Sequence, residues 1–493
     1  MAAAKPLHLA IATLVTLLGC SQGELSEPTQ SAGTGGIAIP HGGSSNGGSS
    51  NGGSSNGGKA NAGNTSGGSG NQGGTSSGGS ASGGGLSTSG GANASGGTSS
   101  DAPPKLCTLE LTCPSEIVED TKIACQLSIG DGLGGSVYAD HVGIELRGRS
   151  SIEYPKPNYG IELRTQAGEE NPVNVLGMGK EADWVLDGSW VDRSFMRNML
   201  TFSLFRDMGW YAARGRFCTL SLNGEARGIY EIREKIKRDD DRVALTLDDG
   251  SGSSFLLKQD SDGSLRLSIG AGSRWQLIYP NEETATAAQV MAAQAFLNQL
   301  DTALNSANPG DPTTGLPALI DITQAVDFVL IEEFSKNVDA YNLSLFLARD
   351  AGKPARFVPW DLDLAYGQPT IRNSGANPAS TGWVNTRTRL ITALIKVDAL
   401  LSALGPRWRT LRAGPLSNAA INQKLDRYQT TLEASAIAAN FAKWPIADVD
   451  FSEIYAPYTL YPVSSYAEEI THFRSWIEAR LSWMDSNIDN YPN

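Results

Sequence analysis

Histidine and positive charge are scarce in this sequence. Its 493 residues include only 4 histidines, and the formal net charge is −13. An acidic chain does not offer the cationic face that phosphate backbones require, so we expect no nucleic-acid partner. The shortage of histidine, together with the absence of a Cys-x-x-Cys pair, argues against a histidine-rich zinc site.

The apolar run at the amino terminus is short. It extends from Leu7 to Leu18 after the cationic Lys5, and it is too short to span a bilayer. A charged start and an apolar middle are typical of a secretory signal, and the ending LLGCS resembles a bacterial lipobox. We therefore expect residues 1–19 to be a lipoprotein signal peptide. Lipidation of Cys20 would anchor the exported protein to the bacterial cell envelope, at the outer membrane or cell surface. The alternative is an ordinary signal peptide followed by a chance cysteine.

Apolar residues nearly disappear between about residues 29 and 102. Gly, Ser, Asn and Thr dominate there, and NGGSS recurs in tandem. Such a segment cannot bury a core, so we expect residues 20–104 to be a disordered linker. The remaining residues, 105–493, are enough for one large domain or two lobes.

Cysteine is also sparse in this second part, which contains Cys107, Cys113, Cys125 and Cys218. In an exported protein an even number of cysteines predicts two disulfides, and the sequence leaves their pairing open.

The first part of the folded region has the patterns of strands. Runs of apolar or alternating residues predict strands at 107–113, 122–129, 142–151 and 158–164. Asn223-Gly224 predicts a hairpin, and a further strand is expected near 254–260. A helix is predicted from about Asp192 to Met208.

The second part has the patterns of helices. They are predicted at 285–304 and 321–336, and again over most of the chain after Thr386. The fold class is therefore α+β, with a strand-rich N-terminal half (about 105–280) and a helical C-terminal half (about 281–493).

Two carboxylates interrupt an apolar run, PWDLDLAYG, that begins at Pro359. In an extended segment Asp361 and Asp363 share one face. Because like charges on a buried face repel and lose hydration, we expect a cation there, and a divalent metal is one candidate. The alternative is a solvated strand end with an Asx turn.

A predicted hairpin connects these aspartates to a third. The helix at 321–336 leads to Asp339, and strands at 343–349 and 355–360 return the chain to Asp361. Since a hairpin brings its two ends together, Asp339 and Asp361 should lie close to one another. This arrangement suits phosphoryl transfer, in which one Asp deprotonates a hydroxyl and another holds Mg²⁺ on the phosphates.

At this point the sequence resembles the CotH kinase family, the spore-coat-protein-H group of atypical kinases. The segments that carry the resemblance occur in family order: RGRSSIEYPKPNYGIEL at 147–163, LGMGKEADWVLDGSWVDRSFMRNMLTFSLFRDMG at 176–209, SLNGEARGIYEIREKIKRDDDRV at 221–243, SKNVDAYNLSLFLARD at 335–350 and VPWDLDLAYG at 358–367.

The resemblance implies a kinase-like two-lobe fold. It also implies transfer of the ATP γ-phosphoryl group, with Mg²⁺ or Mn²⁺, to Ser or Thr of exported or surface proteins, and we expect a monomer. Asp339 resembles the catalytic Asp. The metal ligands implied are Asp361, Asp363 and Asn342, with Asn337 as the alternative to Asn342. The nucleotide-binding residues implied are Arg147, Ser150, Ser151, Lys156, Glu234 and Lys235.

The alternative function is that of a binding or structural module. In that case the chain is a surface lipoprotein that has the kinase fold but is catalytically silent, because little ATP is present outside the cytoplasmic membrane. The alternative to nucleotide binding for Arg147 and Lys156 is that they are solvated or salt-bridged surface residues. For Lys235 the alternative is that it belongs to a solvated charged turn. A lone D-x-D also occurs in glycosyltransferase metal motifs. The helix at about 192–208 has no glutamate to pair with a phosphate-binding lysine, so any such ion pair must come from elsewhere.

Overall fold

The computed structural model describes residues 104–260, 264–266, 274–368, 379–384, 388–446 and 462–492. All of them lie within one compact unit that begins at Ser89. The expected signal peptide, Cys20 and all but the last residue of the expected linker fall outside the described residues. Within the described ranges, no helix has the length and apolar character of a membrane span.

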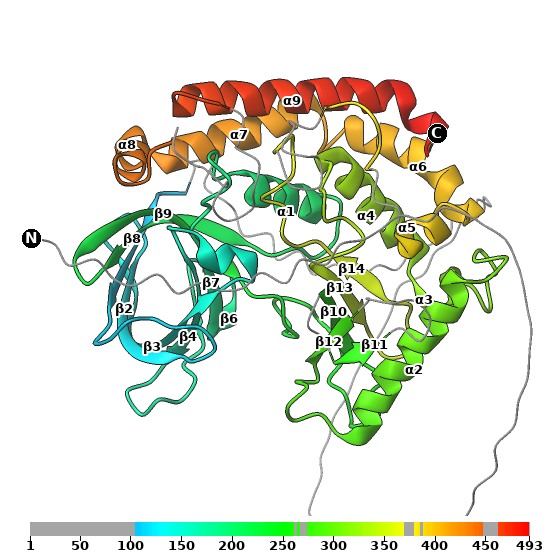
Figure 1. Cartoon of the computed structure of the whole chain (residues 1–493), viewed down its shortest axis with the longest axis horizontal. Coiled ribbons are helices and arrows are strands. Elements are labelled where there is room, and N and C mark those ends of the chain that lie inside the picture. Colours follow the sequence, from blue (N-terminus) through cyan, green and yellow to red (C-terminus); the bar gives the residue numbers. More distant parts are fainter. Residues whose placement is uncertain are drawn as a thin grey trace, which may run out of the picture. The chain divides into compact units, whose positions relative to one another are not determined.

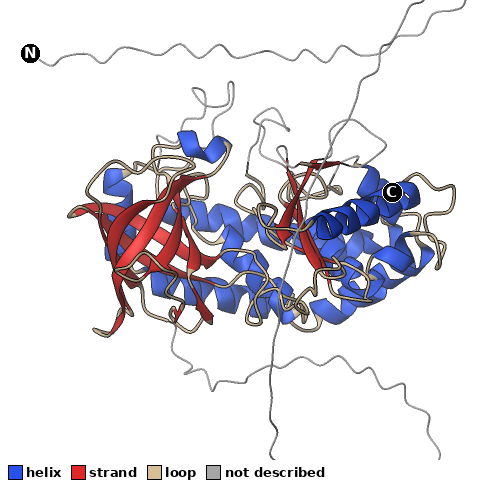
Figure 2. Ribbon diagram, turned by 90° about the horizontal axis from the view of Figure 1, so that it is seen from below, coloured by secondary structure: helices blue, strands red, loops and turns tan. Residues whose placement is uncertain are grey.

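Seven strands close into a barrel in the N-terminal half (Figures 1 and 2). They follow the order β1-β2-β3-β4-β7-β9-β8, in which β1 and β8 pair in parallel and the other neighbours are antiparallel. The strands are β1 (Cys107–Thr112), β2 (Ile123–Gly130), β3 (Ser136–Arg147), β4 (Asn158–Arg164), β7 (Asp183–Asp187), β8 (Gly215–Leu222) and β9 (Glu225–Glu234). A small separate ladder is formed by β5 (Val173–Asn174) and β6 (Lys180–Glu181).

Alternation along the barrel strands separates two cores. On β9, Tyr230 and Ile232 belong to the core inside the barrel, whereas Ile229 belongs to the core shared with the rest of the domain. Successive side chains of a strand point to opposite faces, so Arg233 points to the same side as Ile229, outside the barrel. This placement matters for the site described below.

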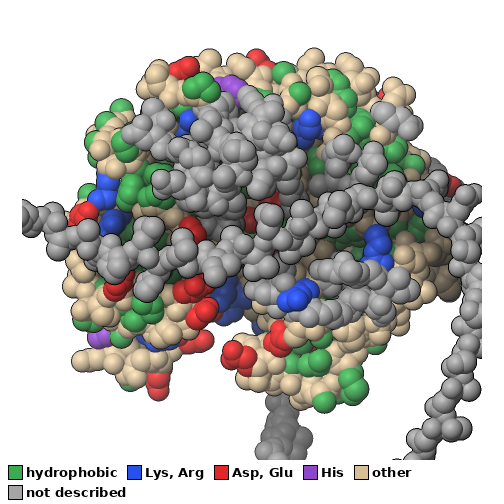
Figure 3. Space-filling view, in the orientation of Figure 1, with side chains coloured by type: hydrophobic (Ala, Val, Ile, Leu, Met, Phe, Trp, Pro, Cys, Tyr) green, Lys and Arg blue, Asp and Glu red, His purple; other side chains and the backbone are tan. Residues whose placement is uncertain are grey.

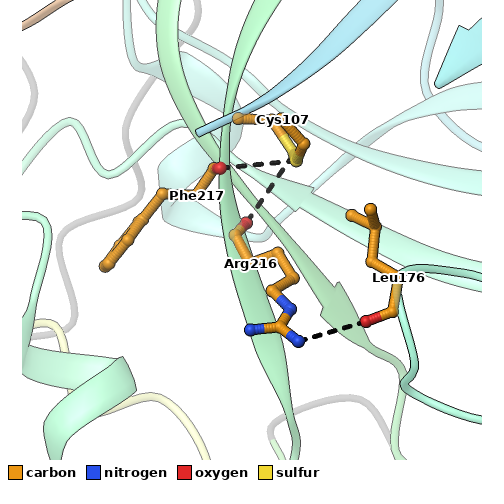
Figure 4. Close-up of a disulfide and its surroundings, with 5 residues drawn as sticks. Cys107, Leu176, Arg216 and Phe217 are labelled. Atoms are coloured by element: carbon orange, nitrogen blue, oxygen red, sulfur yellow. Dashed lines mark hydrogen bonds between the residues drawn. A yellow bond between two sulfur atoms is a disulfide. The ribbon is translucent and has the colours of Figure 1, made fainter. Parts of the chain in front are cut away.

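Two disulfides are present, as the cysteine count predicted. One joins Cys107 to Cys218 and so fastens the parallel pair of β1 and β8, and the other joins Cys113 to Cys125. Figure 4 shows the first of them beside Phe217, with the Arg216 guanidinium donating to the Leu176 carbonyl oxygen at 3.2 Å. The barrel is therefore closed covalently as well as by hydrogen bonds.

A second, five-stranded sheet follows, in the order β11-β12-β10-β13-β14. Its strands are β10 (Phe255–Asp260), β11 (Leu265–Arg266), β12 (Arg274–Tyr279), β13 (Leu345–Arg349) and β14 (Arg356–Val358). Because β10 pairs with β13, this sheet contains strands from both sides of residue 280.

Helices make up most of the described C-terminal half, and α1 (Arg197–Asp207) and the short turn η1 (Ser150–Glu153) lie in the N-terminal half. The C-terminal helices are α2 (Ala287–Leu304), α3 (Leu316–Leu319), α4 (Ile322–Ser335), α5 (Arg389–Leu394), α6 (Asp398–Arg412), α7 (Asn418–Leu432), α8 (Ala434–Lys443) and α9 (Tyr466–Asn487), with the short turn η3 (Ile488–Asn490). The Asp321 side chain caps α4 by accepting from the backbone N–H of Gln324 at 3.1 Å.

The structure confirms the mixed α+β class, with strands in the first half and helices in the second. The predicted hairpin β8–β9 and the helix α4 are confirmed. The helix expected from Asp192 begins instead at Arg197, because Phe195 has a left-handed backbone with φ of 65°. Asp192 still serves this helix, since its carboxylate accepts from the Arg197 backbone N–H at 2.8 Å.

The two disulfides should differ in their effect on stability. A double Cys→Ala variant of Cys107 and Cys218 removes a bridge with a sequence separation of 111, and the equivalent variant of Cys113 and Cys125 removes one with a separation of 12. Since loop-closure entropy grows with loop length, we expect the first variant to lose about 2 kcal/mol more unfolding free energy than the second. Urea denaturation of both full-length variants tests this, and equal losses would contradict it.

Candidate active site

A cavity of ≈ 580 Å³ opens between the barrel and the five-stranded sheet. In Figure 3, acidic and basic side chains gather on both sides of a hollow. The charged residues that line the cavity are Glu119, Asp120, Glu145, Asp187, Asp260, Asp339, Asp361 and Asp363, together with Arg147, Arg149, Arg233 and Lys258. Its lining is therefore strongly polar and carries both signs of charge.

The hairpin of β13 and β14 brings two of the predicted acids into this cavity. The strands pair antiparallel, with Phe346 opposite Val358, and both Asp339 and Asp361 line the cavity. The hydroxyl of Ser344, on the stretch that enters the hairpin, donates to Asp361 Oδ2 at 2.9 Å.

Asp361 lies at a turn with unusual backbone geometry. Its φ is 65°, in the left-handed region that a non-glycine residue rarely adopts. The next residue is held from α1, because the Leu362 backbone N–H donates to Asn198 Oδ1 at 2.8 Å. The ring of Trp360, the residue before Asp361, stacks on Phe202 of α1 with ring centroids 5.9 Å apart. Helix α1 therefore fixes this turn from one side.

Asp363 lies half-buried in an acidic environment. Burial raises its pKa well above the ordinary value, and the neighbouring charges of Asp361, Asp187 and Asp192 raise it further, while Arg233 opposes them. A buried carboxylate surrounded by others is a position at which a bound cation would be stabilised.

The donor types fit Mg²⁺, although no ready-made cage is present. Among the described residues, no three or more His, Cys, Asp or Glu side chains are grouped to hold a metal ion. Mg²⁺ does not require such a cage, because it keeps several waters and binds through one or two carboxylates plus substrate phosphates. Asp361 and Asp363 are suited to that kind of site.

The barrel contributes cations to the same cavity. Arg147, at the end of β3, has its guanidinium carbon 5.5 Å from the centroid of Trp360. Among the described residues this guanidinium has no hydrogen-bond or ion-pair partner. Burial, and next the nearby Arg233, lower the pKa of Arg147 to about 10, so it stays charged at neutral pH. It is therefore available to an anion.

A tight turn follows Arg147 and leads to η1. Gly148 has φ of 128°, and a Cβ at this position would lie 2.1 Å from Ser151 Oγ, so only glycine fits. Ser151 lines the cavity. The side chain of Ser150 lies outside the described part of the structure.

Three predicted nucleotide-binding residues are not among those that line the cavity. Lys156 is buried, and its ammonium donates to the Ile229 carbonyl oxygen at 2.6 Å and to Asn440 Oδ1 at 2.9 Å. Glu234 is buried and accepts from the Arg214 guanidinium at 2.8 Å. Lys235 lies 3.8 Å from Asp183. These residues connect parts of the structure to one another.

Neither candidate amide ligand lines the cavity. The Asn342 backbone N–H donates to the Asp339 carbonyl oxygen at 3.1 Å. Asn337 is buried, and its Oδ1 accepts from the Asp339 backbone N–H at 3.1 Å while its Nδ2 donates to Glu332 Oε2 at 2.9 Å. The Asn337 side chain therefore shapes the loop that carries Asp339.

Sequence reasoning missed Arg233 and Asp187. They lie on the neighbouring strands β9 and β7 and form an ion pair of 2.6 Å beside the cavity. Alternation along IYEIREKI could have indicated that Arg233, rather than Glu234, faces away from the barrel interior, but the pairing of β7 with β9 is not visible in the sequence.

Comparison with known families agrees with this geometry. The family model described as CotH kinase protein matches residues 144–484, a range that contains the residues lining the cavity except Glu119 and Asp120. The chain belongs to the CotH kinase family. It is also similar to "Inner spore coat protein H" of Bacillus subtilis (strain 168), with 21% identity over 193 residues. That match covers 37% of this chain and 49% of the Bacillus protein, so it spans about half of the relative's length.

The burial of Lys156 predicts a pH-dependent contribution to stability. Burial lowers its pKa from the ordinary 10.5 to about 7. The unfolded chain therefore holds more protons than the folded one between these values, and the free energy of unfolding should rise with pH across this window. Lys156→Met should remove that rise. It should also cost about 1–3 kcal/mol by leaving the acceptors on Ile229 and Asn440 unpaired.

Denaturant unfolding between pH 7 and 10 measures both effects, and Lys396→Met at an exposed position is the matched control. If the stability and pH dependence of Lys156→Met equal those of wild type, the hydrogen bonds of Lys156 to β9 and α8 do not contribute to stability as we expect.

Proposed function

We propose that this chain is an ATP-dependent protein kinase of the CotH family, with the barrel and the helical half acting as two lobes around the nucleotide. The observation that supports this most directly is one cavity lined by Asp339 and Asp361, from the two ends of a hairpin, and by Arg147 of the barrel. Phosphoryl transfer needs these elements, namely carboxylates for a metal and a base, and cations for phosphate oxygens.

In this proposal Asp339 orients the acceptor hydroxyl and takes its proton. The hydroxyl oxygen bonds to the γ-phosphorus as the bond to the β–γ bridging oxygen breaks, and ADP leaves. Asp361 and Asp363 would hold Mg²⁺ or Mn²⁺, which when bound neutralises charge on the phosphate oxygens. Arg147 and Ser151, on opposite sides of the Gly148 turn, bind phosphate oxygens from the barrel side.

The acceptor is Ser or Thr of an exported or surface protein. This part of the proposal is supported by the predicted signal peptide and by the name of the Bacillus relative, an inner spore coat protein. Attachment through a lipidated Cys20 and a monomeric state belong to the same proposal.

Substitution of the two hairpin aspartates should separate catalysis from binding. In the full-length protein, Asp339→Asn should lower phosphate transfer from labelled ATP by about 100-fold to 10,000-fold while ATP still binds, because only a proton acceptor is lost. Asp361→Asn should abolish the increase in ATP affinity that Mg²⁺ provides. Asp240→Asn, on an exposed ion pair outside the cavity, is the matched control and should behave as wild type.

The same measurements address the silent alternative. Mg²⁺-dependent ATP binding without transfer by the wild-type protein, on any supplied acceptor or on itself, would favour a binding module with the kinase fold. Equal labelling of wild type and Asp339→Asn would remove Asp339 from the catalytic role. The absence of ATP binding in wild type would contradict the proposed function as a whole.

A further inference from the structure

The Arg233–Asp187 pair holds a buried cation against the acidic loop. Arg233 is only 5% exposed, and its Nη2 donates to Asp187 Oδ2 at 2.6 Å. Its Nη1 also lies 3.6 Å from Glu231 Oε2, on the same strand. The hydrogen bond to Asp187 therefore fixes the orientation of this guanidinium, while its Nη1 and Nε make no hydrogen bond to the described residues.

The guanidinium face of Arg233 lies against aromatic rings. Its central carbon is 4.6 Å from the centroid of Trp360 and 5.6 Å from that of Phe202. Trp360 also meets Phe346 of β13 edge-on, at 6.2 Å between centroids. Because a guanidinium is planar and binds well over an indole ring, this contact attaches the barrel to Trp360.

Trp360 is the residue directly before Asp361. The left-handed backbone of Asp361 is a strained conformation that persists only where its surroundings hold it. Asn198 and Ser344 hold it from α1 and from the hairpin. Arg233 and Arg147 are the barrel residues whose guanidinium groups lie over the Trp360 ring in the described part of the chain. Arg147 has no second anchor there, whereas Arg233 is fixed by Asp187.

We propose that Arg233, fixed by Asp187, is a positioning residue that sets the metal-binding carboxylate of Asp361 through its contact with Trp360. The helix at about 192–208 has no glutamate that could pair with a phosphate-binding lysine. In this proposal the ion pair near the phosphates is instead formed by Arg233 and Asp187, on two neighbouring barrel strands. This inference rests on the proposed metal role of Asp361 and adds the residues that hold it in place.

A simple electrostatic role for Arg233 predicts the opposite outcome. A positive charge close to Asp361 and Asp363 repels a divalent cation, so removing it would tighten metal binding if charge alone mattered. If Arg233 positions the loop, its removal should weaken metal binding in spite of that gain. Loss of groups that orient metal ligands typically weakens affinity by about 10-fold to 100-fold.

The experiment measures Mn²⁺ binding to the full-length protein without nucleotide, by electron paramagnetic resonance of the unbound ion. Wild type and Asp361→Asn define the specific site. We expect Arg233→Met to bind Mn²⁺ about 10-fold to 100-fold more weakly than wild type. Arg233→Lys keeps the charge without the planar face, so it should lie between the two. Asp187→Asn should weaken binding as well, and the double variant with Arg233→Met should be no weaker than Arg233→Met alone.

Arg214→Met is the matched control. Arg214 forms a comparable ion pair with the buried Glu234, at the end of the same strand, but it does not line the cavity. It should lower the melting temperature and leave Mn²⁺ affinity unchanged. Thermal unfolding of every variant shows whether it is folded, and Arg233→Lys carries the test should Arg233→Met not fold.

The outcomes separate the two proposals. Mn²⁺ binding by Arg233→Met or Arg233→Lys that equals or exceeds that of wild type overturns the positioning role and leaves the proposed function standing. Equal Mn²⁺ binding by wild type and Asp361→Asn removes the metal role of Asp361, and both proposals fall with it. A transfer assay adds one more readout, since a positioning defect should lower kcat at saturating ATP more than it raises the KM for ATP.

Discussion

The cavity depends on a balance of buried charge. Carboxylates from β7, from the loop before β13 and from the turn after β14 converge on a space that two barrel arginines also enter. Burying one unpaired carboxylate is costly, and burying several together is more so. The balance here is incomplete, because Asp363 still has a pKa raised well above its ordinary value. The domain therefore maintains a region that favours the arrival of a cation, and its surrounding cores must compensate for that cost.

The surrounding packing shows how that cost is met. Helix α4 is buried along most of its length and leads directly to the loop with Asp339. Arg197 of α1 pairs with Asp192 at 2.5 Å and with Glu469 of α9 at 3.1 Å, and it donates to the carbonyl oxygen of Ala365. These contacts tie the segment after Asp363 to two helices that are distant in sequence. A rigid frame of this kind is what a strained, acidic turn requires.

The sequence was most informative where local chemistry decides the structure. Asn223-Gly224 specified the β8–β9 turn, Asp321 specified the start of α4, and the two runs after Asp339 specified the β13–β14 hairpin. The expectation that Asp339 and Asp361 share one site followed from that hairpin alone, and both residues line the cavity. Short-range rules suffice in such cases because the interacting residues are near one another in the chain.

Long-range pairing defeated the same reasoning. The hydrogen bond from Lys156 to Asn440 joins residues 284 positions apart, so no local pattern could indicate it. Arg233 was overlooked because its role depends on which strand lies beside β9. The barrel itself was not predicted. Its closure depends on the pairing of β1 with β8, and no local sequence pattern indicates that pairing.

That parallel seam also constrains how the chain is assembled. During synthesis β1 emerges first, and it can pair with β2 at once, but its other edge has no partner until β8 has been made. Until then one strand edge of the unfinished barrel is open, and an open edge is where foreign strands add. A folding intermediate in which β8 has not yet docked would therefore be exposed to wrong pairing along the free edge of β1.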